Sequence, residues 1–134
     1  MKEHVHPEAA ALTALAGLAD DAPVVMLNLL RFRAVANYPD GSGHAPCSGR
    51  EAYARYGAAV RQHLAAAGGK PIWRGATQLT LIGPADEGWD EVLLVHYPSR
   101  AAFLRMVSDR DYVAASVHRT AALSDSRLIA MRAG

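Results

Sequence analysis

The sequence predicts an α+β fold in which two helices pack on one face of a four-stranded antiparallel sheet, with an extra helix at the N-terminus. First, the 134 residues are 51% hydrophobic, which is enough apolar material for one core. Second, strand-like and helix-like segments follow one another in the order helix, then β-α-β-β-α-β. We expect residues 1–134 to form a single domain with its core over 23–132.

The N-terminal helix is predicted directly after Pro7, whose fixed φ suits the first turn of a helix. Within the alanine-rich stretch that follows, apolar residues recur at three-residue spacing at Leu12, Leu15 and Leu18. His4 and His6 precede this helix, in a terminus that we expect to be frayed.

The first strand is predicted over Val24–Phe32, an almost continuous apolar run that suits a strand buried on both faces. Asn28 interrupts this run. Residues 34–48 then carry a dense cluster of glycine, proline and aspartate without periodicity, which predicts a long loop. Loops of this length within compact domains are often functional or mobile.

A long helix is predicted over 49–67. Ser48 and Glu51 have the spacing of a capping box, in which each side chain satisfies the backbone N–H of the other residue. Gly68 and Gly69 provide a stop signal. One face of the helix carries residues at three- and four-residue spacing, namely Tyr53, Tyr56, Val60, His63, Leu64 and Ala67.

The second half of the chain predicts the remaining elements. Residues 71–82 and Glu91–Tyr97 are rich in β-branched and aromatic residues and predict two strands joined as an antiparallel hairpin. Ser99 can cap a third helix, Asp109 can restart one, and residues 127–132 close the chain as a last short strand. This order is that of a ferredoxin-like fold, which leaves one sheet face open. Because apolar residues alternate onto both faces of Glu91–Tyr97, we expect a second copy of the sheet to cover that face.

Several segments, read in order, resemble one known family. The chain is similar to the domain of unknown function family 1330, within the dimeric α/β-barrel superfamily, and the resemblance spans roughly residues 23–131. It implies a homodimer of ferredoxin-like domains. The superfamily includes cofactor-independent monooxygenases, lactone isomerases, polyketide cyclases and haem-handling proteins, so the fold leaves the chemistry open. The segments are Met26-Leu27-Asn28-Leu29-Leu30-Arg31-Phe32, Gly68-Gly69, Leu81-Ile82-Gly83-Pro84, Trp89-Asp90, His96-Tyr97-Pro98-Ser99-Arg100-Ala101-Ala102-Phe103, Asp111-Tyr112 and Arg119-Thr120-Ala121-Ala122-Leu123-Ser124-Asp125.

Composition argues against several classes of partner and cofactor. The 14 basic and 13 acidic residues are interspersed, so we expect neither nucleic acid nor a membrane surface as a partner. No apolar run is long enough to span a membrane, and we expect a cytoplasmic protein. Cys47 is the only cysteine, so one chain has no internal disulfide. His44 and Cys47 do not supply the three or four ligands of a metal site, and we expect no metal and no cofactor.

Two residues are candidates for catalysis. Asn28 places a carboxamide in an apolar strand, where it must be hydrogen-bonded or destabilise the fold. It orients a carbonyl or enolate in a pocket, or it bonds to a nearby loop or across the dimer interface. His96 lies near the end of the third strand and suits a general base near neutral pH, or a structural role at the dimer interface.

Five further residues are candidates for substrate binding. Tyr53 and Tyr56 on the long helix, together with Trp73 on the second strand, suit an aromatic ligand, or they are ordinary core packing. Arg119 shares a helix face with Tyr112 and is expected to point inward. An inward arginine binds an anionic group, or it forms a salt bridge with one of the nearby aspartates Asp109, Asp111 and Asp125.

These candidates lead to three hypotheses. The first is a dimer whose subunits each bind a small aromatic or carbonyl molecule in a cleft between sheet and helices, lined by Asn28, Trp73, His96 and Arg119. If this protein is an enzyme, it is a cofactor-independent isomerase, cyclase or monooxygenase, with His96 as base and Asn28 or Arg119 holding an oxyanion. The second is a haem-binding or haem-degrading protein that uses Asn28 and Trp73. The third is a non-catalytic dimeric scaffold, which predicts a closed, wholly apolar interior.

Overall fold

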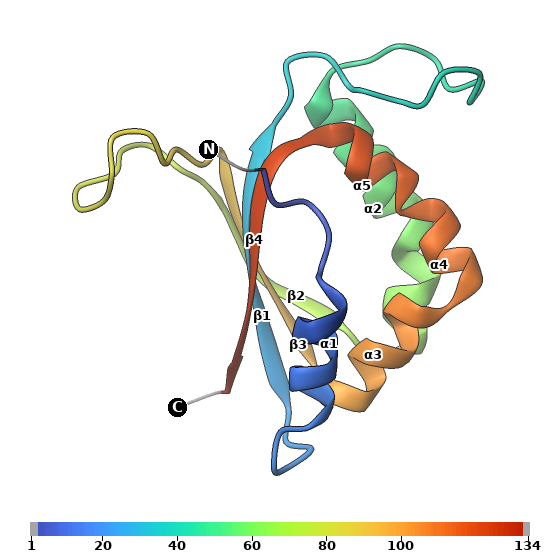
Figure 1. Ribbon diagram of the computed structural model, residues 1–134, viewed down its shortest axis with the longest axis vertical. Coiled ribbons are helices and arrows are strands. Elements are labelled where there is room, and N and C mark those ends of the chain that lie inside the picture. The colour runs from blue at the N-terminus through green and yellow to red at the C-terminus, as the bar shows by residue number, and fades with distance from the viewer. Residues whose placement is uncertain (1–2, 133–134) are drawn as a thin grey trace.

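The computed structural model describes residues 3–132 and consists of one four-stranded antiparallel sheet with helices on a single face (Figure 1). The strand order is β2-β3-β1-β4, as the ferredoxin-like arrangement predicts. The strands are β1 (Val24–Phe32), β2 (Lys70–Ala76), β3 (Glu91–Tyr97) and β4 (Leu123–Arg132). The helices are α1 (Ala9–Ala16), α2 (Gly49–Ala66), α3 (Arg100–Ser108), α4 (Arg110–Ala115) and α5 (Val117–Ala122). No helix within residues 3–132 has the length and apolar character needed to cross a membrane.

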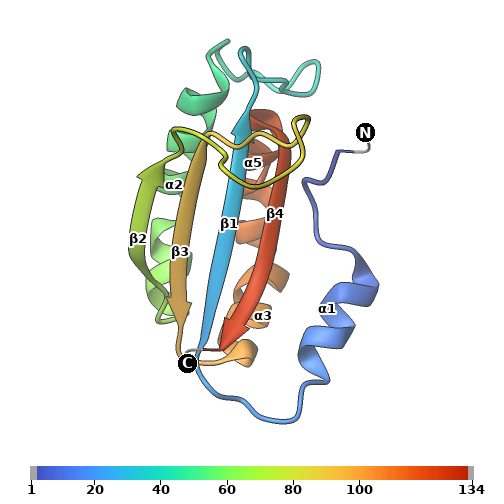
Figure 2. The ribbon, with the colours of Figure 1, turned by 90° about the vertical axis from the view of Figure 1, so that its left-hand side faces the viewer.

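The central strand is β1, which pairs with β3 on one side and β4 on the other. Val24, Met26, Asn28 and Leu30 are buried beneath the helices, whereas the residues between them are only half-buried on the opposite face. Our expectation that this strand is buried on both faces is therefore wrong for a single chain. The opposite face carries apolar residues such as Leu27 and Leu94. No helix of residues 3–132 covers it (Figure 2).

The core beneath the helices is divided into two clusters. Met26 belongs to a cluster that joins β1 and β3 to α3, and Leu30 belongs to one that joins β1 to α2 and the end of α5. Asn28 lies between these two residues on the same face of β1, and only 8% of its surface is exposed. The amide therefore stands at the junction between the two apolar clusters.

The start of α2 confirms the predicted capping box. The Glu51 amide N–H donates to Ser48 Oγ, and the Ser48 amide N–H donates to Glu51 Oε1, both at 3.1 Å. The first residue of the helix, Gly49, lies so close to its neighbours that a Cβ there would stand 2.2 Å from the Arg33 carbonyl oxygen and 2.6 Å from that of Ala122. The absence of a side chain at this position allows α2 to meet β1 and α5.

The N-terminal segment is ordered rather than frayed. Residues 3–8, which we call the N-terminal strap, lie beside β4: the His4 amide N–H donates to Asp125 Oδ1 at 2.9 Å, and Ser126 Oγ donates to the His4 carbonyl at 2.7 Å. The helix α1 that follows lies beyond the β4 edge of the sheet (Figure 2) and has no fully buried residue.

Three predicted boundaries are corrected. The second strand ends at Ala76 rather than at residue 82, because residues 77–82 pair with no strand of residues 3–132 and form part of a projecting loop (Figure 1). The last strand begins at Leu123 instead of residue 127, since residues 123–126 also pair with β1. The helical segment that starts after Asp109 is divided at Ser116 into α4 and α5.

We predict opposite effects for alanine at two glycines of α2. Gly49→Ala should destabilise the fold by about 2 kcal/mol or more, because the new methyl group meets backbone atoms that cannot move away easily. Gly57→Ala should stabilise it by about 0.5–1 kcal/mol, since the site is open and alanine is the better helix former. Urea unfolding of both variants provides the test, and equal effects would contradict this account of the α2 contact.

Candidate functional site

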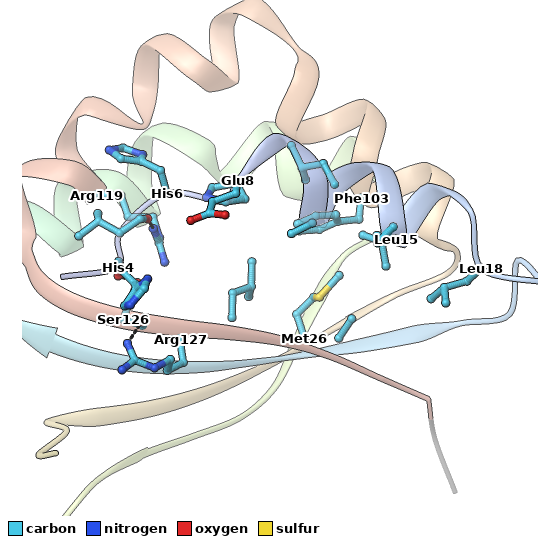
Figure 3. Close-up of a pocket in the computed structure, with 17 residues that line it drawn as sticks. His4, His6, Glu8, Leu15, Leu18, Met26, Phe103, Arg119, Ser126 and Arg127 are labelled. Carbon is cyan, nitrogen blue, oxygen red and sulfur yellow. Dashed lines mark hydrogen bonds between the residues drawn. The ribbon is translucent and has the colours of Figure 1, made fainter. Parts of the chain in front are cut away.

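A cavity of about 530 Å³ lies between α1, the N-terminal strap and the helix-facing side of β4 (Figure 3). Its volume is in the range of binding sites for small organic molecules. Apolar side chains form one part of the wall, namely Leu12, Leu15, Leu18, Met26, Phe103, Leu128 and Ala130. Polar side chains gather where the strap passes α5 and β4, namely His4, His6, Glu8, Arg119, Ser126 and Arg127.

The leucines of α1 explain why this helix lies over the cavity. Leu12 and Leu15 of α1 and Leu18, which follows the helix, all line it, so the three-residue spacing seen in the sequence places these apolar side chains toward β4. The C-terminal end of α1 is held by the buried guanidinium of Arg100, whose Nη1 donates to the carbonyls of Leu15 at 2.8 Å and Leu18 at 2.9 Å. A cation at this end also interacts favourably with the helix dipole.

Arg119 projects from α5 into the polar part of the cavity (Figure 3). Its Nη1 donates to the Val5 carbonyl of the strap at 2.6 Å. Within residues 3–132 it forms no salt bridge, so the predicted pairing with Asp109, Asp111 or Asp125 is not observed. Because a guanidinium has five N–H donors, one carbonyl leaves most of its hydrogen-bonding capacity free for an anionic group.

The other arginine that borders the cavity, Arg127, is already neutralised, and its pairing with Leu29 assigns its side chain to the face of the sheet that no helix covers. Its Nη1 donates to Asp125 Oδ1 at 2.9 Å, and its Nη2 lies 3.8 Å from Glu87 Oε1. Burial by itself would raise the pKa of Asp125, but hydrogen bonds from the His4 and Ser126 amides and from Arg127 outweigh it and hold that pKa below its usual value. Asp125 therefore remains charged and keeps Arg127 and the strap in place.

Asn28 lies next to the cavity floor without being one of its lining residues. Met26 precedes it by two on the same face of β1, Leu128 is its pairing partner on β4, and both of these line the cavity. The Asn28 Nδ2 group donates to the carbonyls of Leu93 at 3.3 Å and Met26 at 3.4 Å. These long bonds occupy the amide nitrogen, and no donor within residues 3–132 pairs with Oδ1, which remains an available acceptor at the cluster junction.

The three predicted tyrosines lie together inside the fold. The hydroxyl groups of Tyr56 and Tyr112 are 2.5 Å apart, and the Tyr53 and Tyr56 rings have centroids 5.4 Å apart. Burial raises the pKa of Tyr53 and of Tyr56 well above the usual tyrosine value, and the positive charge of Arg119 partly offsets both shifts. The Tyr53 and Tyr56 hydroxyls are thus neutral hydrogen-bonding groups that interact electrostatically with Arg119.

Trp73 and His96 occupy the other side of the sheet. His96 pairs with Val25 and Trp73 pairs with Leu94, so both belong to the face that no helix covers, whereas Asn28 belongs to the helix face. Trp73 is 56% exposed there. The structure therefore brings Arg119 to the cavity and Asn28 beside it, but it does not bring Trp73 or His96 to the same site.

A further polar cluster, which our sequence analysis missed, ties the 34–48 loop to α5. Tyr38 Oη lies 2.7 Å from His118 Nδ1 and accepts from Arg55 Nη1 at 3.3 Å. His44 from the same loop packs against both rings, with centroids 4.7 Å from Tyr38 and 4.8 Å from His118. Desolvation, His44 and Arg55 together lower the pKa of His118, so it is neutral at pH 7.

The sequence analysis also missed the strap and Ser126 as parts of the cavity. The sequence gives little indication of this contact. Strap residues contact β4 residues more than 120 positions away, and no periodicity spans such a separation. The leucine spacing of α1 was recognised, but it did not reveal what the leucines face.

Fold and cavity together define a class of protein: a ferredoxin-like α+β domain with a cavity beside the edge of its sheet. Within that class, the family described as Domain of unknown function (DUF1330) matches residues 43–133, and the chain belongs to this family.

Solved structures agree with this assignment. The RPA0582 protein of unknown function from Rhodopseudomonas palustris is 42% identical, with a TM-score of 0.88 over 97% of this chain and 96% of that one. The methylated RPA0582 protein has a TM-score of 0.91 at the same 42% identity, and the match covers 99% of this chain and 96% of that one. A dimeric protein of unknown function with a ferredoxin-like fold from Bacteroides fragilis has a TM-score of 0.50 at 13% identity. The match covers 81% of this chain and 94% of that one, and this likeness shows the fold alone. No curated protein matches the chain.

We predict that His118 makes the stability of the fold sensitive to mild acid. Its pKa is lower in the folded chain than in the unfolded one, so the folded state binds a proton less readily, and stability present above about pH 6.5 is lost as the pH falls below it. His118→Asn should therefore lose less unfolding free energy than wild type between pH 7.5 and 5.5 in urea titrations. Parallel pH profiles for the two proteins would contradict this prediction.

Proposed function

We propose that this protein binds a small organic molecule, aromatic or carbonyl-containing, in the cavity beneath α1, and that it does so as a homodimer. The observation that carries the proposal is the cavity itself, because an apolar wall with a few convergent polar groups is the usual form of a small-molecule site. A scaffold protein is expected to have a closed, wholly apolar interior, whereas polar groups line a cavity beneath α1 here, which supports binding.

The candidate residues divide by role. Arg119 lines the cavity. Asn28 and the tyrosine group of Tyr53, Tyr56 and Tyr112 do not line it, and we assign them a supporting role. The apolar side chains of α1 and β4 suit contact with the apolar part of a ligand, and Arg119 suits a hydrogen bond to a polar group of the same ligand. Asn28 supplies a buried acceptor near the floor.

The catalytic alternatives have less support. A proton transfer with His96 as base and Asn28 as oxyanion donor requires both side chains at one site, yet they lie on opposite faces of the sheet. A haem site that uses Asn28 and Trp73 together meets the same obstacle, since Trp73 shares the face of His96. We therefore propose binding and assign no reaction.

The homodimer is proposed from the uncovered face of the sheet. Its apolar residues come from all four strands and include Val25, Leu27, Leu29, Trp73, Val92, Leu94, Ile129 and Met131. A face of this kind on a monomer would be an exposed apolar patch, and a second copy buries it with two-fold symmetry. The loop over residues 77–90 extends past this face (Figure 1) and carries Leu79, Leu81 and Ile82, which are 78–96% exposed. These side chains are suited to extend the same interface.

We predict that 4-phenylbutanamide, a neutral aromatic carbonyl compound, binds the cavity with a dissociation constant of about 1 mM, as expected for a ligand of this size. Ala130→Trp should weaken this binding by about 10-fold or more, because Ala130 lines the cavity and the indole would fill it. Ala10→Trp on the exposed side of α1 is the control and should bind as wild type does. An NMR titration measures both, and binding that survives Ala130→Trp would place the ligand elsewhere.

We predict that the protein sediments at twice its monomer mass of 14.3 kDa. Leu94→Glu should weaken dimerisation by more than about 100-fold, since it introduces two unpaired charges into a symmetric apolar interface. Val113→Glu on α4 is the control, because Val113 is an exposed apolar residue on the helix side. Sedimentation equilibrium distinguishes the outcomes, and a monomeric wild type or a dimeric Leu94→Glu variant would overturn the proposed interface.

A further inference from the structure

We infer that the molecule bound beneath α1 is a carboxylate with an apolar body, and that its carboxylate replaces the Val5 carbonyl on Arg119. This inference rests on the proposed function, because it assumes that the cavity is a binding site. It adds the chemical class of the ligand and identifies Arg119 as the residue that selects it.

The first argument is the hydrogen-bonding state of Arg119. Its guanidinium is half-buried in the cavity and donates to a single backbone carbonyl, that of Val5, at 2.6 Å. A carbonyl carries only a partial negative charge, so it satisfies part of what a guanidinium can bind. A carboxylate offers two oxygens that match two parallel N–H groups, which is the stronger and more specific arrangement.

The second argument is the balance of charge around the polar part of the cavity. Arg127 is paired with Asp125 and Glu87, so its charge is compensated. Glu8 also lines the cavity but is exposed, and among residues 3–132 no salt bridge joins it to Arg119. Within residues 3–132 no acidic side chain pairs with Arg119, and Glu8, the unpaired carboxylate of the same cavity, is exposed to solvent, so the guanidinium can pair with a carboxylate of a ligand.

The third argument is the shape of the cavity. Arg119 and the strap mark one part, whereas Leu15, Leu18 and Phe103 mark the other (Figure 3). A ligand whose carboxylate meets Arg119 therefore places its apolar body between α1 and the floor formed by Met26 and β4. Such a division between one charged group and an apolar body describes a monocarboxylate with an aryl or alkyl chain.

The competing carbonyl belongs to a segment that lies outside the sheet, although the Val5 side chain packs against the Leu30 cluster. The strap contacts β4 and α5 through side chains, namely those of Asp125, Ser126 and Arg119, and no backbone–backbone hydrogen bond joins it to the sheet within residues 3–132. The helix α1 has no fully buried residue and is anchored by Arg100 at its C-terminal end. Replacement of the Val5 carbonyl breaks only one hydrogen bond of the strap, while the His4 bonds to Asp125 and Ser126 and the contact of Arg100 with α1 persist.

The test compares two isosteric probes, 4-phenylbutanoate and 4-phenylbutanamide, which differ in charge but hardly in shape. At pH 7.5 the wild-type protein should bind the carboxylate about 10- to 100-fold more tightly than the amide, as expected for a charge-assisted pair. Arg119→Gln should abolish this preference, so that the two probes bind with similar affinities, and Arg119→Lys should restore part of it. Arg61→Gln, at an exposed position of α2, is the control and should keep the full preference.

The outcomes separate this inference from the proposed function. A preference for the carboxylate that disappears in Arg119→Gln supports both. If wild type binds the two probes equally, the carboxylate assignment is overturned while the cavity remains a binding site. This comparison uses the wild-type protein alone, so it does not depend on the folding of any variant. A preference that persists in Arg119→Gln also overturns it. Failure of wild type to bind either probe overturns the inference together with the proposed function.

Discussion

β1 forms backbone hydrogen bonds with β3 and β4 on its two sides, and the alternation of its side chains determines what each face of the sheet meets. Its even-numbered residues, from Val24 to Leu30, contact the helices and build both core clusters. Its odd-numbered residues supply the middle of the uncovered face. A shift of one residue in either pairing would exchange the two sets, so the register determines both the core and the composition of the uncovered face.

The cavity results from the unequal covering of β4. The first half of this strand, Leu123 to Ser126, is largely buried beneath α5 and the strap, while Leu128, Ile129 and Ala130 are exposed. Only α1 covers the helix-facing side of that second half, and its leucines approach without becoming fully buried. A short alanine-rich helix has too little side-chain volume to fill the space, so a cavity remains at the edge of the sheet.

The sheet separates the two proposed surfaces. The cavity with Arg119 lies on the helix side, and the apolar face with Trp73 and His96 lies on the other. Ligand binding and dimerisation can therefore be altered by different substitutions with little direct contact between them. Membership in a family of unknown function and likeness to a protein of unknown function agree with this fold and assign no ligand.

The sequence by itself determined the family, the order of the elements, the capping box of α2 and the burial of Asn28, because local spacing and hydrophobic pattern carry that information. It also identified Arg119 as an inward-facing residue, since helix periodicity places side chains on faces. It did not determine that residues 77–82 lack a partner strand, that the strap lies beside β4, or that His96 and Asn28 lie on opposite faces of the sheet. Those features depend on contacts between residues far apart in the chain, where register and packing decide, and only the tertiary structure shows them.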